Sequence, residues 1–153
     1  MLAITKSQNN RLYTDDALIH SLHCTIRIFA KTLNNSISDF DIYSSEWSIL
    51  KIVKEHEAIS QSEIAAFLDI EPAAISKTLS RLEKKGIIYR QRLNNNKEKN
   101  IFLTEQAKTQ YDQLAAVVEK HRNAALQSLS IEERTTLHNL IKKIYADIEK
   151  NNA

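Results

Sequence analysis

The residues best suited to chemistry on a partner molecule lie between Pro72 and Lys99. This segment carries eight basic side chains against two acidic ones, whereas the whole chain has a formal net charge of only +2. The rest of the sequence is therefore mildly acidic. A local positive field on an acidic body is typical of a surface that contacts phosphate groups, and it indicates double-stranded DNA as the partner.

One stretch inside this segment has the spacing of a helix that reads DNA. Ile75, Leu79 and Leu82 repeat at helical intervals and predict a buried side. Small residues on the opposite side would let the helix approach base edges in a groove about 12 Å wide, while long basic ones reach guanine or phosphate. That side carries Ala73, Ser76, Lys77, Ser80 and Arg81. An exposed basic helix face is more often only solvated, so the neighbouring elements decide the interpretation.

Those neighbours predict a helix-turn-helix. Ser60 and Glu63 fit a capping box, which starts a helix. Asp69 falls where a turn is needed, and Asp tolerates left-handed backbone better than most residues. The only proline, Pro72, suits the first turn of the next helix, and the only glycine, Gly86, suits its left-handed C-terminal cap.

A β-hairpin is expected directly after the helix-turn-helix, which covers about residues 60–85. Residues 87–93 predict a strand, three asparagines a tight polar turn, and residues 100–103 the returning strand, so the wing covers about residues 87–103. Its basic side chains would contact phosphate or the minor groove and supply affinity rather than sequence choice. They are Arg90, Arg92, Lys97 and Lys99.

Long helices are predicted on both sides of this winged unit. After an irregular arm over residues 1–13, one helix begins at Thr14, and a second runs from Ser44 to near His56. Thr104 begins a helix with apolar positions as far as Leu129, and a capping box at 130–133 begins the last one. One Gly and one Pro in 153 residues also favour helix. We therefore expect a mainly α fold with a small β-hairpin wing.

In this order of elements the sequence resembles the multiple antibiotic resistance regulator (MarR) family of bacterial transcription factors. The resemblance covers nearly the whole chain and is most specific from Ser62 to Ile88 and at Leu103-Thr104. It implies a single domain over residues 1–153. Within it, 44–103 would form the winged helix-turn-helix, and 14–40 and 104–150 the N- and C-terminal dimerisation helices.

The resemblance also implies a function. The chain would be a homodimeric, sequence-specific DNA-binding transcription regulator, a repressor, that binds a palindromic operator and releases it when a small ligand or an oxidant shifts its conformation. The two reading helices would lie one helical turn of DNA apart, roughly 34 Å. The residues expected at the DNA are Ser60, Gln61, Ser62, Pro72, Ala73, Ala74, Ser76, Lys77, Ser80, Arg81, Arg90, Arg92, Asn95, Asn96, Lys97 and Lys99.

The chain departs from the family pattern at the wing tip and at two glycine positions. Where the family has an acidic residue followed by basic ones, this chain has Asn95, Asn96 and Lys97. The wing arginine is therefore at best a lysine, which speaks against insertion into the minor groove. Asp69 and Ala107 stand where the family has glycine, and we expect the backbone to tolerate both.

Two further groups of residues could bind or react. Trp47 and Tyr111 lie where relatives form a pocket for a small aromatic ligand, although packing in the core is the alternative. His20, His23 and Cys24 share one face of the first helix and could hold zinc or tune a reactive thiol, with Cys24 as the residue that would sense an oxidant. No fourth ligand is close in sequence, although His56, His121 or His138 could approach in the fold. We expect no metal and no other cofactor.

Other classes of protein fit the sequence less well. A winged domain can also be a protein-interaction module that does not bind DNA, but such modules typically lack a basic wing. An enzyme would depend on the histidines and the cysteine alone, because the chain has no phosphate-binding glycine loop, catalytic carboxylate pair or nucleophile motif. No apolar run approaches the roughly 20 residues of a membrane span, no signal-peptide core follows Met1, and one cysteine cannot form an intramolecular disulfide. We expect a cytoplasmic protein without a membrane partner.

Overall fold

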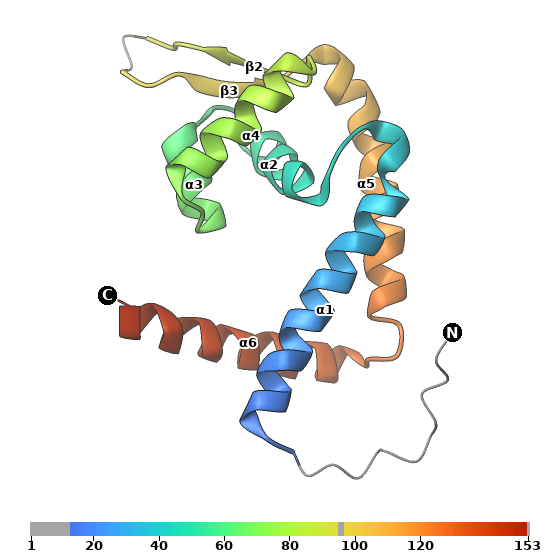
Figure 1. The fold of residues 1–153 in the computed structure, drawn as a ribbon. Helices are drawn as coiled ribbons and strands as arrows, with labels where there is room; N and C mark the ends of the chain where they lie inside the picture. The colour runs from blue at the N-terminus through green and yellow to red at the C-terminus, as the bar shows by residue number, and fades with distance from the viewer. Residues whose placement is uncertain (1–12, 95–96, 153) are drawn as a thin grey trace.

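The computed structural model describes residues 13–94 and 97–152 (Figure 1). These residues form α-helices, one short 3-10 helix and a small antiparallel sheet, so the fold is mainly α with a β-hairpin wing, as predicted. The irregular arm expected at the N-terminus lies outside the described residues, except for Tyr13. None of the described helices is long and apolar enough to cross a membrane.

The first two helices begin where local signals predict them. In α1 (Asp15–Ser36), the Thr14 hydroxyl accepts a hydrogen bond from the amide of Ala17, and two aspartates occupy the first turn. The helix ends at Ser36, and the chain then tightens into the 3-10 helix η1 (Ser38–Phe40). A left-handed Asp41 turns the backbone into α2 (Ser44–Glu55).

The helix-turn-helix is formed by α3 (Gln61–Leu68) and α4 (Pro72–Lys84). Both bonds of the predicted capping box are present: the Glu63 amide donates to the Ser60 hydroxyl, and the Ser60 amide donates to the Glu63 carboxylate. Asp69 ends α3 in left-handed backbone with φ of 50°, and Gly86 follows α4 with φ of 71°. The start of α3, its turn and both limits of α4 are therefore confirmed.

Three short strands form the sheet, in the order β1-β3-β2. β2 (Ile88–Gln91) pairs with β3 (Asn100–Leu103) as the predicted hairpin, with Ile88 opposite Leu103. The expected strand over 87–93 is too long at both ends, since ladder pairing spans only residues 88–91. β1 (Ile59–Ser60) pairs with β3 and was not predicted, because two residues are too few to show a period.

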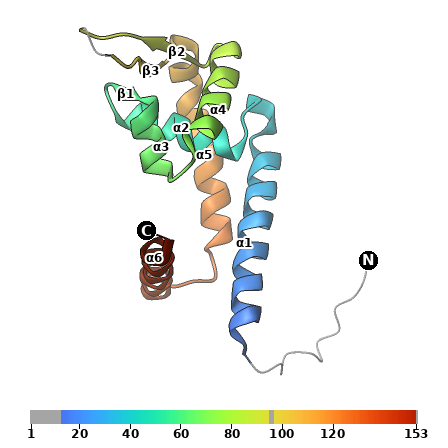
Figure 2. The same cartoon turned by 60° about the vertical axis from the view of Figure 1, so that its left-hand side comes forward.

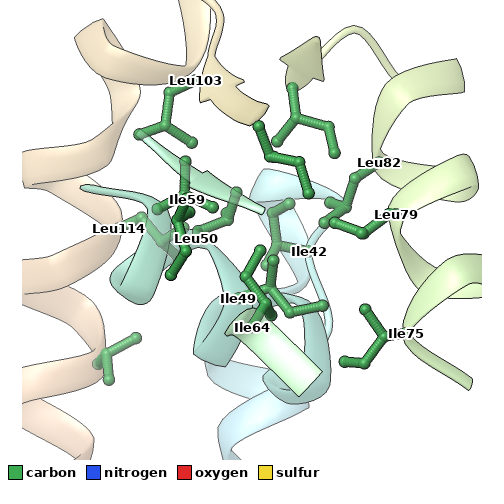
Figure 3. Close-up of a cluster of buried hydrophobic side chains, with 14 of the residues drawn as sticks. Ile42, Ile49, Leu50, Ile59, Ile64, Ile75, Leu79, Leu82, Leu103 and Leu114 are labelled. Atoms are coloured by element: carbon green, nitrogen blue, oxygen red, sulfur yellow. The ribbon is translucent and has the colours of Figure 1, made fainter. Parts of the chain in front are cut away.

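The hydrophobic core lies between α2, α3, α4, the sheet, the end of α1 and part of α5 (Figure 3). From α4 it receives the predicted Ile75, Leu79 and Leu82, which are at most 2% exposed. Across this core stand Ile49 of α2 and Ile64 of α3, both as deeply buried. The core therefore fixes which side of α4 faces outward.

The remaining helices extend away from this winged unit. α5 (Glu105–Ala125) lies beside α1, where the Thr32 hydroxyl is 2.8 Å from Nε2 of His121 (Figures 1 and 2). The prediction that α5 reaches Leu129 is wrong. Arg134 of α6 (Ile131–Asn152) instead donates to the carbonyl of Leu126, which caps α5, and to the carbonyl of Leu129 in the turn between the two helices.

Helix α6 contacts the winged unit through a side-chain hydrogen bond at Asp69. It lies at the end of α5 far from the wing in both views (Figures 1 and 2). The Tyr145 hydroxyl donates to the Asp69 carboxylate at 2.9 Å, and this bond raises the pKa of the Tyr145 hydroxyl. None of the described α6 residues is buried, so its apolar stripe is open to solvent.

Candidate nucleic-acid interface

The outward side of α4 is the polar, partly basic face that the sequence predicts. Lys77 and Ser80 are exposed on it, and Ser76 is half-buried. Pro72, Ala73 and Ala74 are exposed at the start of the helix. The hairpin β2-β3 lies beside α4 (Figure 1). This arrangement allows a groove of DNA to meet the helix and the hairpin together.

Arg90 joins the hairpin to α4. Its Nη2 donates to the Ser80 hydroxyl at 3.3 Å, and its Nε lies 3.4 Å from the Glu83 carboxylate. Two predicted DNA contacts, Ser80 and Arg90, are thus brought together. Of the other predicted wing contacts, Arg92, Lys97 and Lys99 are exposed, while Asn95 and Asn96 lie outside the described residues.

A carboxylate from the wing caps the start of α3. Oε1 of Glu98 accepts hydrogen bonds from the amide of Ser62 at 3.1 Å and from its hydroxyl at 2.7 Å. The carboxylate therefore satisfies one of the free amides that begin a helix and faces the positive end of the helix dipole. Sequence reasoning missed this contact, because it joins residues 36 positions apart and leaves no local signal.

The capping box at the start of α3 also has an electrostatic effect. The amide and the hydroxyl of Ser60, in that order, lower the pKa of the Glu63 carboxyl, because both bonds favour its charged form. Ser60 is buried, Gln61 half-buried and Ser62 exposed. Of these predicted DNA contacts at the α3 start, Ser62 is therefore the most accessible.

A buried carboxylate connects α2 to α4. Glu46 is 0% exposed, and its Oε1 lies 2.6 Å from Nε of Arg81 while Oε2 lies 3.2 Å from Nζ of Lys85. Oε2 also accepts a hydrogen bond from the Tyr43 amide at 2.9 Å. Both cations lie over the Tyr43 ring. The ring centroid is 5.7 Å from Cζ of Arg81 and 5.3 Å from Nζ of Lys85.

Glu46 is a second residue that sequence reasoning missed, although a signal exists. Positions 46, 49, 50 and 53 form one helical stripe, and Ile49, Leu50 and Val53 are buried in the core. A glutamate buried at the first position of an apolar stripe requires a cation as partner. Arg81 and Lys85, one turn apart on α4, supply it.

The two residues proposed for a ligand pocket lie together. The rings of Trp47 and Tyr111 are 5.2 Å apart, and Tyr111 lines a small cavity with Phe40, Leu50 and Leu114. Burial is the main cause that raises the pKa of the Tyr111 hydroxyl, and Glu55 and Asp112 add to it. The cavity holds only about 30 Å³, far less than the roughly 300 Å³ that a drug-sized ligand requires.

The histidines and the cysteine of α1 stay on the surface. Sγ of Cys24 lies 3.4 Å from Nε2 of His20, one helical turn away, and His23 is exposed beside them. Across residues 13–94 and 97–152, three or more His, Cys, Asp or Glu side chains nowhere gather into a possible metal site. The thiol is thus accessible to solvent, with an imidazole as its neighbour.

The comparison with known proteins bears directly on this geometry. Residues 42–99, which contain α2, the helix-turn-helix and most of the wing, match the pattern described as "MarR family". The chain is similar in this segment to the MarR family of transcription regulators. This family consists of transcription regulators and not enzymes, in agreement with the sequence-based expectation.

Individual relatives extend the match beyond the winged unit. The uncharacterized HTH-type transcriptional regulator YwoH of Bacillus subtilis is 28% identical over 130 residues, which cover 85% of this chain and 95% of YwoH. Two solved structures, each 24% identical, share the fold. The transcriptional regulator SlyA has a TM-score of 0.80 and covers 90% of this chain and 96% of its own. A mutant MarR from E. coli complexed with operator DNA has a TM-score of 0.77 and covers 84% and 93%.

Proposed function

We propose that this protein is a MarR-family regulator and represses transcription as a homodimer that binds a palindromic site in double-stranded DNA. The observation that carries the proposal is the exposed face of α4, where Lys77 lies between Ser76 and Ser80 with the basic hairpin alongside. A helix of this kind enters the major groove, and its long cation reaches a base edge. The E. coli MarR complexed with operator DNA has the same fold, which supports this use of it.

The other predicted contacts have a different role in this proposal. The exposed wing cations Arg92, Lys97 and Lys99 contact phosphates and supply affinity that depends on salt. Small or uncharged residues at the helix starts allow the backbone of the DNA to approach closely. These are Ser60, Gln61, Ser62, Pro72, Ala73 and Ala74, and we keep Asn95 and Asn96 as predicted contacts at the wing tip.

The homodimer is supported by apolar side chains that the single chain leaves uncovered. On α1, Ile26 and Ile28 are 67% and 54% exposed, and on α6 Leu140 and Ile148 are 50% and 57% exposed. Neighbouring exposed apolar residues of a soluble protein mark an interaction surface. A second copy related by a two-fold axis covers both surfaces at once and sets two α4 helices over a palindrome.

Control by a signal is the last part of the proposal. A small aromatic ligand binds at Trp47 and Tyr111 by opening the cavity between the winged unit and α5, or an oxidant reacts with the exposed Cys24 on α1. Either event changes the relative position of the two winged units. The affinity for DNA then falls.

The decisive experiment selects bound sequences from random duplex DNA, with and without an oxidant and phenolic ligands, and then measures affinities by fluorescence anisotropy. We expect a palindromic consensus. Lys77→Ala should relax the preference at one base position and weaken binding by roughly ten-fold or more, since it removes a base contact. Lys142→Ala removes an equal charge from exposed α6 and should leave affinity unchanged.

Two outcomes would contradict the proposal. The first is the absence of any specific complex for the wild-type chain at moderate salt. The second is a double variant, Lys77→Ala with Arg81→Ala, that binds DNA as well as the wild type. That result would favour a winged protein-interaction module.

A further inference from the structure

Glu46 is the one charged residue among the described side chains that is fully buried. A buried carboxylate is stable only when cations and hydrogen-bond donors surround it, since removing either partner leaves an uncompensated charge. Arg81 and Lys85 of α4 and the amide of Tyr43 provide these partners. The position of α4 against α2 is therefore fixed by charge as well as by the apolar core.

Arg81 uses only part of its guanidinium for this contact. Within residues 13–94 and 97–152, its hydrogen bond to protein runs from Nε to Glu46, and its side chain is 43% exposed. The two terminal nitrogens carry four further N–H donors in the same plane. Because Nε is held at 2.6 Å and the Tyr43 ring lies beneath Cζ, the guanidinium has a fixed orientation before any partner arrives.

We propose that Glu46 is a positioning residue for DNA binding, which holds Arg81 so that its terminal nitrogens meet a backbone phosphate beside the major groove. The inference rests on the proposed DNA-binding function and deepens it. Arg81 lies one turn after Lys77 on the same side of α4, so it follows the groove when Lys77 reads a base. A side chain that is ordered in the free protein loses less conformational freedom on binding, which increases affinity.

The direction in which neutralising Glu46 changes the affinity for DNA separates this role from simple electrostatics. A carboxylate close to DNA repels phosphate, so its neutralisation alone should tighten binding. If Glu46 instead withdrew Arg81 from the DNA, its neutralisation would release the arginine and also tighten binding. Only a positioning role predicts that removing a negative charge weakens the complex.

The experiment compares Glu46→Gln with Glu71→Gln in operator and non-specific duplexes. Glutamine keeps the size of the side chain and an acceptor for the Tyr43 amide. Glu71 is an exposed carboxylate directly before α4, and no side-chain bond of its own caps that helix. We expect Glu46→Gln to weaken operator binding by about ten-fold, the loss of one well-placed charged hydrogen bond, and Glu71→Gln to leave it unchanged or tighter. The affinity of each variant is calculated for its folded, active fraction, and that fraction is measured by titration at high DNA concentration.

A double-mutant cycle with Arg81→Ala separates positioning from a merely structural role. It measures whether the effect of Glu46→Gln on DNA affinity depends on Arg81. If Glu46 acts on DNA through Arg81, Glu46→Gln should have no further effect on affinity once Arg81 is alanine. Equal losses in both backgrounds would overturn the positioning role. So would tighter or unchanged binding by Glu46→Gln alone.

Arg81→Lys covers the case in which Glu46→Gln does not fold. It keeps the charge but lacks Nε and the planar fork, and we expect a similar weakening. If Arg81→Lys bound the operator as tightly as the wild type does, the proposal would be overturned. If the wild type itself bound no DNA, the proposed function would fail, whereas specific wild-type binding with either contrary result refutes the positioning role alone.

Discussion

The basic side chains of α4 and the wing, which are proposed to contact DNA, differ in how firmly the free protein holds them. Lys77 is exposed, whereas Arg90 contacts Ser80 and Glu83, and Arg81 is bound to the buried Glu46. Ordered arginines suit phosphate contacts, because their planar donors need no rearrangement. A free lysine can adjust to a base edge. In the proposed complex, Lys77 would therefore select the sequence and the arginines would set the register on the backbone.

At the same scale, the capping box of α3 predicts a pH-dependent contribution to stability. The pKa of Glu63 is lowered in the folded state, so its contribution is present above the pKa of the unfolded chain and is lost as pH falls through the lower folded pKa. Glu63→Gln should thus lower the free energy of unfolding at pH 7 by about 0.5–1 kcal/mol, with the difference from wild type shrinking below about pH 4.3.

Urea denaturation at pH 7 and pH 3 measures this difference. Glu57→Gln, an exposed carboxylate before β1, serves as the control with the same charge change. A Glu63→Gln penalty equally large at both pH values would contradict the assignment.

At the scale of elements, the winged unit is held together by contacts between its parts as well as by its core. Glu98 joins the wing to α3, Arg90 joins it to α4, and Glu46 joins α2 to α4. The Thr104 hydroxyl also donates to the carbonyl of Gly86, where α4 gives way to β2. These bonds fix the hairpin relative to the helix that it flanks.

Glu98→Ala tests the contact between the wing and α3. It should lower the free energy of unfolding by about 1 kcal/mol, because an amide and a hydroxyl at the start of α3 lose their shared acceptor. Hydrogen exchange should speed up at the Ser62 amide and leave the start of α5 unchanged. Unchanged protection at Ser62 would show that water replaces the carboxylate at no cost.

Which of these elements the sequence predicts depends on how far apart the interacting residues are. The starts of α1, α3, α4 and α5 are predictable, since a cap or a proline acts on amides two or three residues away. The inward side of α4 follows from its apolar period. The contacts of Glu98 with Ser62 and of Glu46 with Arg81 span more than thirty positions, so they emerge only when the elements pack.

At the scale of the whole molecule, the chain has a compact winged unit and long helices whose apolar sides are uncovered. The core draws on α2, α3, α4, the sheet and parts of α1 and α5, and it includes no described residue of α6. The far helices therefore contribute little to the fold of one copy. In the proposed homodimer, a second copy would cover their exposed apolar residues.

Ile141→Glu tests this pairing. Ile141 is 46% exposed on α6, and a charge there should separate the proposed homodimer into monomers. Sedimentation equilibrium checks the mass. Affinity for a palindrome should fall by about 100-fold or more, because two half-sites are no longer bound together.

Lys142→Glu, also an exposed position of α6, is the control for the added negative charge. It should remain dimeric. If Ile141→Glu kept both its mass and its operator affinity, the pairing surface would lie elsewhere.

The hydrogen bond from Tyr145 to Asp69 has a consequence for how the two ends of the molecule communicate. It connects the last helix directly to the turn between α3 and α4, across 76 positions of the chain. A change in α6 that favours or breaks this bond alters the free energy of the turn. By thermodynamic reciprocity, a ligand held at α4 alters the free energy of α6 by the same amount. If α4 binds DNA and the far helices pair as proposed, these two equilibria are linked through one phenol and one carboxylate.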